Sequence, residues 1–341
     1  MARGVTGAAN EGSGTGSGAQ HRPAQENGGH TDLGVSVVVC AYTQERWELT
    51  RAALASVLSQ RPMPLQVLLV VDHNANLAAR ARRELPANVI VLESDGRPGL
   101  SGARNTGLRA ATQPITAFLD DDAEARPGWL PSLIEPYCRT EVVATGGRVY
   151  ARWPGSRPQW LPPEFDWVVG CSYVGLPDSV SVVRNPIGAN MSLQTGLALE
   201  VGGFDTAVGR AGGRPRGCEE TELAIRLTAK RPGSAVLYVP AAAVDHHVGQ
   251  ERLRFGYFLR RCWHEGVSKA AVVRLAGSSA GLERERRHVA VVIPAALFRD
   301  LRRCATGDPG AFMRIAVALG GLATATAGYL SGRARQAALG R

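Results

Sequence analysis

Three consecutive carboxylates follow a short apolar run at residues 118–123, FLDDDA. An apolar run that ends in acids is typical of a buried strand, here one that delivers Asp120, Asp121 and Asp122 into a turn. Hard divalent cations such as Mg²⁺ and Mn²⁺ prefer carboxylate oxygens and share them with substrate phosphates. A metal ion bound here would neutralise a pyrophosphate leaving group. The alternative is a solvated acidic turn that caps a helix beginning near Pro127.

The elements around this turn predict an α/β domain. Four apolar runs predict strands, at residues 35–40, 67–71, 89–92 and 115–119. Helical patterns follow the first three, at residues 47–59, 76–85 and 103–111, with a Gly-rich turn expected at 96–102. This alternation predicts a mainly parallel, Rossmann-like sheet flanked by helices, which binds ligands beyond the carboxyl ends of its strands. Asp72 and the run 120–122 both stand at such ends.

Composition bounds the organisation of the chain. The 341 residues, 45% of them hydrophobic and 20% charged, suffice for a full core and an appended subdomain. The six cysteines form no C-x-x-C pair, which disfavours a structural zinc or redox centre and fits a reducing compartment. We expect a disordered leader at 1–33, an α/β domain at 34–250 divided at about residue 139, and a basic helical region at 251–341.

The positive charge is concentrated in the last quarter of the chain. Residues 251–341 carry sixteen Lys or Arg against six Asp or Glu, whereas the rest of the chain carries 23 against 24. The tail lacks the interleaved aromatic and basic residues of nucleic-acid platforms, so we expect no nucleic-acid partner and favour an anionic membrane surface. Its apolar runs at 289–298 and 315–330 are shorter than a membrane span and predict interfacial helices. A packed helical subdomain or a dimer interface remains the alternative, and the oligomeric state stays open.

Eight segments occur in the order found in family 2 glycosyltransferases, which the chain resembles over about residues 36–248. The segments are SVVVCAYTQER (36–46), VVDHN (70–74), GLSGARNTGLRAA (99–111), FLDDDA (118–123), NPIGANMS (185–192), GGFD (202–205), GCEETELAIRL (217–227) and VDHHV (244–248). Each segment alone is weak, but the ordered set is specific. The resemblance implies a GT-A fold and an inverting, metal-dependent transfer from a nucleotide-sugar.

The resemblance also assigns residues to the donor, the metal and the acceptor. Residues 34–139 would form the nucleotide-sugar half and residues 140–250 the acceptor half. Asp122 is the favoured direct ligand of Mn²⁺ or Mg²⁺, with Asp120 beside it, and Asp121 could share that work. The implied donor contacts are Ala41, Tyr42, Glu45, Asp72, Arg104, Asn105, Asp120 and Asp121, and the implied acceptor contacts are Asn190 and Met191.

Two further motifs contribute a candidate base and a candidate ligand. The family usually has Glu-Asp at its base position, whereas this chain has Glu219 and Glu220 before a helix predicted at 221–230. We favour Glu220 as the base that takes the acceptor proton, with Glu219 as the alternative. Both acids could instead complement the helix dipole. His246 follows an apolar run and is favoured over His247 as a further metal ligand.

The sequence thus predicts a glycosyltransferase that acts on a lipid-linked or cell-envelope glycan, or on a glycosylated metabolite. It is expected in the cytoplasm, peripherally attached to the inner face of the cell membrane. A sugar-phosphate nucleotidyltransferase would need a Gly-rich loop after the first strand, where this chain has AYTQER. A non-catalytic sugar-binding protein is also disfavoured, because clustered carboxylates cost stability when they serve no purpose.

Overall fold

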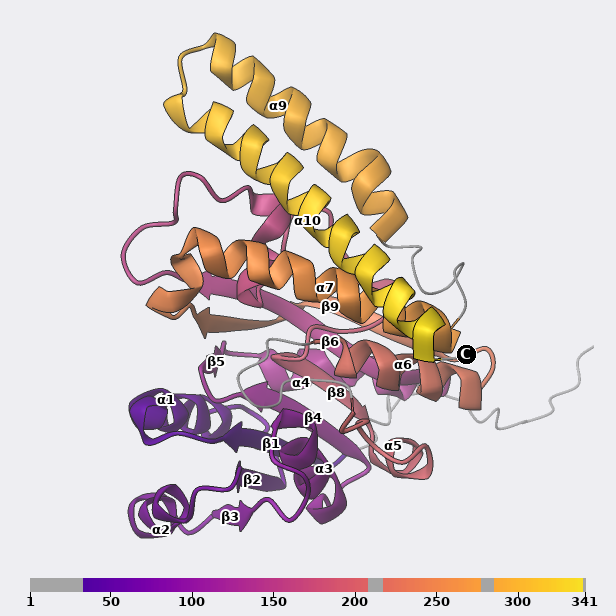
Figure 1. Ribbon diagram of the computed structural model, residues 1–341. Helices are drawn as coiled ribbons and strands as arrows, with labels where there is room; N and C mark the ends of the chain where they lie inside the picture. Colours follow the sequence, from indigo (N-terminus) through magenta and orange to yellow (C-terminus); the bar gives the residue numbers. More distant parts are fainter. Residues whose placement is uncertain (1–32, 208–216, 277–284, 340–341) are drawn as a thin grey trace, which may run out of the picture. The chain divides into compact units, whose positions relative to one another are not determined.

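Figure 1 shows the computed structural model of the chain, which describes residues 33–207, 217–276 and 285–339. The leader expected at 1–33 lies outside the described residues, apart from its last position. The strands are β1 (Val35–Ala41), β2 (Gln66–Val71), β3 (Val89–Glu93), β4 (Ile115–Asp120), β5 (Ala123–Ala125), β6 (Val142–Arg152), β7 (Ser181–Val183), β8 (Asn190–Gln194) and β9 (Ala235–His247). The α-helices are α1 (Trp47–Leu58), α2 (Ala75–Glu84), α3 (Leu100–Ala110), α4 (Trp129–Ile134), α5 (Thr195–Glu200), α6 (Glu219–Lys230), α7 (Phe255–Ala276), α9 (Ile293–Ala305) and α10 (Pro309–Leu339). Short 3₁₀ helices are η1 (Gln44–Arg46), η2 (Glu135–Cys138), η3 (Pro163–Val169) and η4 (Gln250–Leu253), and η5 (His288–Val292) is a π-helix.

Within these described residues the strands form one nine-stranded sheet, ordered β3-β2-β1-β4-β8-β6-β9-β5, with β7 paired to β9. The first four strands in this order run parallel to one another. β8 is antiparallel to both of its neighbours, β4 and β6. The four strands predicted from apolar runs are confirmed, and the sheet is mixed, with helices on both faces (Figure 1).

The central strands are mostly apolar and buried because helices cover both faces of the sheet. Val37 and Val39 of β1 belong to a core shared with α1, α2 and α4, whereas Val38 belongs to the core under α3, α5 and α6. Gly107 brings α3 close to the sheet, since a Cβ at this position would lie 2.4 Å from Cγ1 of Val38. Alternate residues of β1 therefore supply two separate cores.

The second half of the sheet depends on a long bent strand. β9 pairs with β6 over most of its length, and the register shifts twice, the second time between Gly147 and Val149. Gly147 is required there, because a Cβ would lie 1.6 Å from the carbonyl oxygen of Ala242. Beyond the bend, the end of β9 pairs with β5 directly after the three aspartates, with Ala123 opposite His246.

The C-terminal helices pack against the sheet domain. Phe258 and Cys262 of α7 share a core with Leu161 and Phe165 of the loop region before and within η3. α10 crosses α7 and runs antiparallel to α9 (Figure 1). α10 is much longer than the apolar run at 315–330, and by length and composition alone it could cross a membrane.

The crossing of α7 and α10 is a direct contact between backbones. A Cβ at Gly266 of α7 would lie 2.0 Å from the carbonyl oxygen of Ala325. A Cβ at Gly328 of α10 would lie 2.2 Å from the carbonyl oxygen of Trp263. These two glycines fix α10 closely against α7, and α7 follows β9 after the short helix η4.

Candidate active site

The carboxyl ends of β1 and β2 lie side by side, because Ala41 pairs with Val71. Just beyond them, Asn74 donates from Nδ2 to the carbonyl oxygen of Tyr42 at 3.1 Å. The ring of Tyr42 is exposed. The edge of the sheet predicted to bind the donor is therefore formed by the turns after these two strands.

Asp72 joins this edge to the start of α3. Its Oδ2 accepts the backbone N–H of Gly99 at 2.8 Å, and its Oδ1 lies 2.7 Å from Nδ1 of His73. Gly99 has a φ of 124°, a conformation that favours glycine, and α3 begins at the next residue. The helix thus begins two residues before the end of the Gly-rich turn expected at 96–102. Glu45 is exposed in η1.

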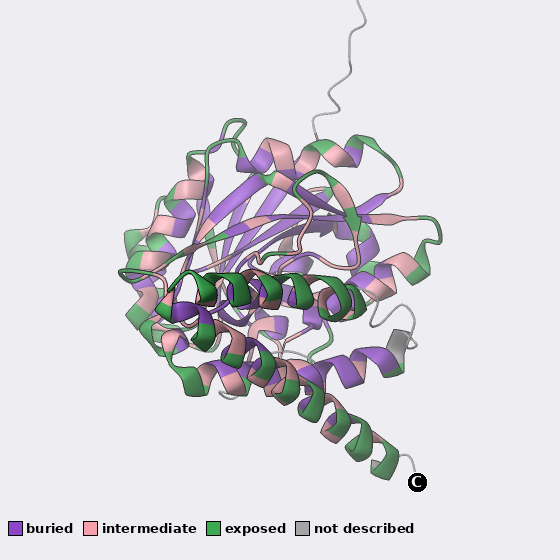
Figure 2. Cartoon of the chain, turned by 90° about the horizontal axis from the view of Figure 1, so that it is seen from above, coloured by how far each residue is buried: buried purple, intermediate pink, exposed green. Residues whose placement is uncertain are grey.

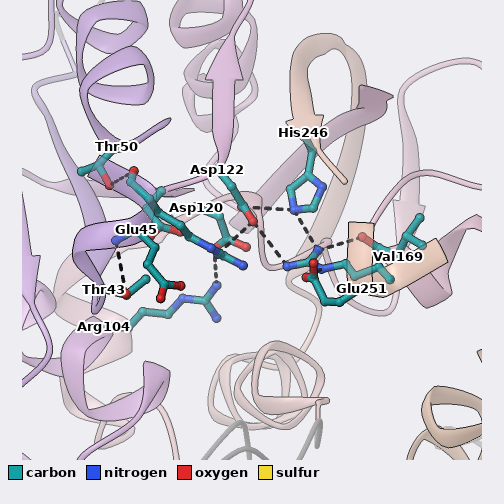
Figure 3. A network of polar contacts seen from close by, with 12 residues as sticks. Thr43, Glu45, Thr50, Arg104, Asp120, Asp122, Val169, His246 and Glu251 are labelled. Atoms are coloured by element: carbon teal, nitrogen blue, oxygen red, sulfur yellow. Dashed lines mark hydrogen bonds and ion pairs between the residues drawn. The ribbon is translucent and has the colours of Figure 1, made fainter. Parts of the chain in front are cut away.

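Strand pairing brings the aspartate run and His246 together. Ala123 lies opposite His246 in the ladder, and the backbone N–H of His247 donates to the carbonyl oxygen of Asp122 at 2.8 Å. As a result, Nε2 of His246 lies 3.2 Å from Oδ1 of Asp122 (Figure 3). One ligand atom each from Asp120, Asp122 and His246 lies within 4.8 Å of the other two.

Asp122 is buried and surrounded by positive groups. Its Oδ2 lies 3.0 Å from Nη1 of Arg46 and 3.3 Å from Nη2 of Arg252. Burial by itself raises the pKa of Asp122, but His246, Arg252 and Arg46 outweigh it and hold that pKa well below its usual range. Burial and the charge of Asp122 raise the pKa of the neighbouring Asp121 to about 7. Oδ2 of Asp121 is buried without a hydrogen-bond partner among the described residues.

This donor set fits a divalent metal ion. Two carboxylates and one imidazole are acceptable ligands for Mn²⁺, and the positive groups keep Asp122 ionised. The second histidine of the motif is engaged elsewhere, since Nε2 of His247 lies 2.9 Å from Oε1 of Glu124. The arrangement favours His246 over His247, as the sequence did.

Arg104 links the aspartate run to the acid pair on α6. Its guanidinium is buried and contacts Asp120 at 3.1 Å, Glu219 at 3.3 Å and the carbonyl oxygen of Gly188 at 2.9 Å. Burial lowers the pKa of Arg104, but the carboxylates of Asp120 and Glu219 raise it by more. Arg104 therefore holds three separate segments in fixed relation to one another.

Glu219 and Glu220 lie in different surroundings. Glu219 is buried, with Oε1 on Arg104 and Oε2 without a hydrogen-bond partner in the described part of the chain. Glu220 is partly exposed and lines the pocket described below. Burial and the charge of Glu219 raise the pKa of Glu220 to about 7. A carboxylate with such a pKa can accept a proton near neutral pH.

The helix that carries these acids begins earlier than predicted. α6 starts at Glu219 rather than at Thr221, so both acids lie in its first turn. Cys218 precedes the helix with a φ of 79°, a rare conformation for a residue other than glycine. The two adjacent acids consequently point in different directions from the helix start.

Asn105 supports the fold with its side chain. Its Nδ2 donates to the carbonyl oxygen of Phe204 at 2.8 Å, and its Oδ1 accepts the N–H of the same residue at 2.7 Å. A Cβ at Gly203, which has a φ of 70°, would lie 2.4 Å from that oxygen. The side chain of Asn105 thus forms hydrogen bonds with the GGFD turn instead of serving the edge of the sheet that was predicted to bind the donor.

Asn190 and Met191, the expected acceptor contacts, lie in the interior. Asn190 accepts from the indole of Trp129 at 2.8 Å and donates to the carbonyl oxygens of Ala242 and Arg148 at 2.7 and 3.1 Å. Met191 is fully buried in the core. Neither residue lines the pocket, whereas residues 185–189 of the same motif do.

A pocket of about 360 Å³ connects Glu219 and Glu220 to the C-terminal helices. Arg104, Asp120, Glu219, Glu220 and His246 line one part of it. Most of the remaining wall is formed by residues of η3, α7, α9, α10 and η5 and by residues 184–189. The pocket therefore spans regions 34–250 and 251–341, which the sequence treated as separate.

Several residues of the site gave no clear signal in the sequence. Arg46 lies within the opening motif, but its charge was not connected to the aspartates. Arg252 follows His246 by six residues, and its Nη1 donates to the carbonyl oxygen of Val169 at 3.1 Å. Lys269 lies on α7 and was counted only as tail charge. For the region around His246, the sequence offered the apolar run that ends in a histidine and the motif VDHHV.

Comparison with known proteins agrees with this geometry. A parallel sheet with antiparallel additions, an aspartate run at the end of β4 and a histidine from β9 fit the GT-A fold of two solved glycosyltransferases. The family model "Glycosyl transferase family 2" matches residues 36–189. The glucosyl-dolichyl phosphate glucuronosyltransferase of Haloferax volcanii is 35% identical over 238 residues, which are 69% of this chain and 76% of that protein. The chain belongs to glycosyl transferase family 2 and is a glycosyltransferase.

More distant similarities support the same fold. The succinoglycan biosynthesis protein ExoM of Rhizobium meliloti is 27% identical over 244 residues, covering 70% of this chain and 73% of that protein. A mannosyltransferase from Pyrobaculum calidifontis, solved with GDP-Man and Mn²⁺, has a TM-score of 0.55 at 18% identity and covers 87% of this chain and 86% of its own. GalNAc-T7, solved with UDP, GalNAc and Mn²⁺, has a TM-score of 0.53 at 18% identity over 71% of this chain and 51% of its own.

Proposed function

We propose that this glycosyltransferase moves a sugar from a nucleotide-sugar to a hydroxyl group of a lipid-linked glycan, with inversion at the anomeric carbon. The observation that carries the proposal is that the carboxylate of Glu220 lines the same pocket as Asp120 and His246. Residues 34–139 would then bind the donor, residues 140–250 the acceptor, and residues 251–341 the acceptor lipid and the membrane.

Asp120, Asp122 and His246 would hold a divalent metal ion, and Mn²⁺ suits this donor set better than Mg²⁺. The ion would neutralise the charge that develops on the departing nucleoside diphosphate. The chain contributes a second electrostatic element, because Arg46 lies beside the aspartates and is partly exposed towards the donor edge. Ala41, Tyr42, Glu45 and Asp72 would hold the nucleoside.

Glu220 would take the proton from the acceptor hydroxyl as its oxygen bonds to the anomeric carbon and the bond to the diphosphate breaks. A pKa of about 7 suits this role, because the base is available at neutral pH and still binds the proton well. Glu219 would position the site through Arg104 rather than touch the acceptor. Arg104 in turn fixes Asp120 relative to α6.

A lipid-linked acceptor is supported by the relative from Haloferax volcanii, whose name specifies a dolichyl phosphate substrate. It is also supported by large apolar side chains that α9 and α10 leave exposed, among them Phe298, Leu301, Phe312 and Met313. Figure 2 shows the exposed faces of this helix pair. With the basic residues of the tail, this surface would attach the enzyme to the inner face of the cell membrane.

The proposal is tested by screening nucleotide-sugars for thermal stabilisation of the full chain, with and without Mn²⁺. The stabilising donor is then incubated with short-chain polyprenyl-phosphate-linked sugars, and the anomeric configuration of the product is read by NMR. We expect Mn²⁺-dependent stabilisation by one donor and inverted product. Retained configuration, or no Mn²⁺-dependent stabilisation by any nucleotide-sugar, would contradict the proposal.

A further inference from the structure

Part of the pocket has an apolar wall. Phe165 and Trp167 of η3 contribute to it, with ring centroids 5.9 Å apart. Ile293 of α9 lines it as well. Leu322 and Ala325 of α10 complete the wall. Apart from the indole N–H of Trp167, these side chains offer no hydrogen bonds to a sugar, so a purely polar acceptor would leave most of the wall unused.

A cluster of charges lines the same pocket. Its cations are Arg184, Arg261 and Lys269, and its acids are Glu265 and Glu285. Nζ of Lys269 lies 3.1 Å from Glu265 and 2.9 Å from Glu285, and Arg184 lies 2.8 Å from Glu285. Three cations face two acids within this cluster, whereas the pocket lining as a whole has five of each. Opposing charges hold the cations in place before any ligand enters.

The outward face of α10 continues the apolar character. Phe312, Leu319 and Leu330 are exposed along the helix, while Leu322 and Ala325 line the pocket. α10 thus presents one apolar face to the pocket and another to the surroundings. A lipid chain that leaves a membrane beside α10 would meet apolar side chains both on the outward face of the helix and on the face that lines the pocket.

We propose that the apolar wall binds the hydrocarbon chain of the acceptor and that the charge cluster binds the phosphate attached to it. The chain would lie between η3, α9 and α10, the phosphate beside Lys269 and Arg184, and the attached sugar near Glu220. This inference rests on the proposed function, because it names the acceptor subsite of the same pocket. It commits to one ligand chemistry, an isoprenoid or alkyl chain that ends in a phosphate.

The test measures binding of farnesyl phosphate to the full chain by calorimetry, below the concentration at which the lipid forms micelles. Inorganic phosphate carries the charge alone, and farnesol carries the chain alone. We expect farnesyl phosphate to bind at least tenfold more tightly than either of them. Equal binding of farnesol would overturn the role of the charge cluster.

Variants locate the binding. Ala325→Phe fills the pocket and should weaken farnesyl phosphate binding by tenfold or more. Ala323→Phe makes the same change at an exposed position of α10 and should leave binding unchanged. Leu322→Ala enlarges the pocket instead and should weaken binding several-fold, since part of the chain loses its apolar contacts. Thermal unfolding of each variant checks its fold. If Ala325→Phe does not fold, the affinity of Leu322→Ala shows whether the apolar wall binds the lipid chain.

The outcomes separate this inference from the proposed function. Unchanged affinity in folded Ala325→Phe and Leu322→Ala variants, or no binding of farnesyl phosphate, would overturn the lipid subsite whether or not the chain transfers sugar. Conversely, lipid binding that these variants weaken would stand even if no nucleotide-sugar is used. A wild-type enzyme that transfers sugar equally well to acceptors with and without a chain would keep the proposed transfer and reject the subsite.

Discussion

The pKa of Glu220 gives a pH dependence that can be worked out in advance. The structure raises that pKa from 4.5 to about 7. The deprotonated fraction of such a group rises roughly tenfold between pH 6 and pH 8, so kcat/KM for the acceptor should rise by a similar factor. A glutamate with an ordinary pKa would be almost fully ionised at pH 6, and its profile would be nearly flat over this range.

The neighbouring acid provides the decisive variant. The charge of Glu219 is, after burial, the next cause of the raised pKa of Glu220. Glu219→Gln should therefore move the rise in kcat/KM to lower pH. Glu220→Gln should lower kcat by about a hundred- to ten-thousand-fold and keep donor affinity nearly intact. Glu200→Gln, which changes an exposed acid paired with Lys230, is the matched control and should change neither quantity.

Stability gives a second measurement with a definite sign. Because the pKa of Glu220 is raised in the folded state, its contribution to stability is fully present below pH 4.5 and is lost as the pH rises through about 7. Glu220→Gln should therefore gain stability over the wild type between pH 5 and pH 8, by at most about 3 kcal/mol at about 1.4 kcal/mol per pKa unit. Urea unfolding at both pH values measures this difference. A flat wild-type rate profile together with no stability difference would refute the reasoning.

Three further predictions concern the metal and the membrane. Asp122→Ala should abolish Mn²⁺-dependent donor binding while the fold survives, as thermal shift would show, and the exposed Asp178→Asn should not. Arg46→Gln should strengthen Mn²⁺ binding several-fold without nucleotide, because Arg46 contacts Asp122 where the ion would bind; unchanged affinity by calorimetry would contradict this. Binding to vesicles should require anionic lipid and weaken with salt. Equal binding to neutral and anionic vesicles would contradict the role of the tail in membrane attachment. So would a protein that stays on membranes after residues 289–341 are removed.

The sequence predicted the parallel, N-terminal half of the sheet well because its signals there are local. A strand buried on both faces is an unbroken apolar run, and the acids at the end of β4 follow such a run directly. Helix ends were less accurate: α6 starts before Thr221 because Cys218 adopts a left-handed conformation that the sequence pattern does not reveal. The resemblance to a known family supplied the base and the histidine.

The acceptor side could not be predicted in the same way, because it depends on pairing between distant segments. Asn190 matches a family motif, yet its side chain is engaged by Trp129 and by two backbone carbonyls across the sheet. The contact of Arg252 with Asp122 requires the end of β9 to lie beside β5. Patterns of polarity along the chain do not specify such a register between segments more than a hundred residues apart.

The glycine contacts between α7 and α10 hold the helix proposed to contact the membrane at a fixed position relative to the candidate active site. His246 lies at the end of β9, and β9 is followed by η4 and then α7. Gly266 and Gly328 allow α10 to pack closely against α7. If α10 rests on the bilayer as proposed, the height of the catalytic acids above the lipid surface is set by this crossing. The packing of α10 on α7 would then determine which acceptor hydroxyl, at a given distance from the phosphate, reaches the acids. A larger side chain at either glycine would change which sugar position is reached.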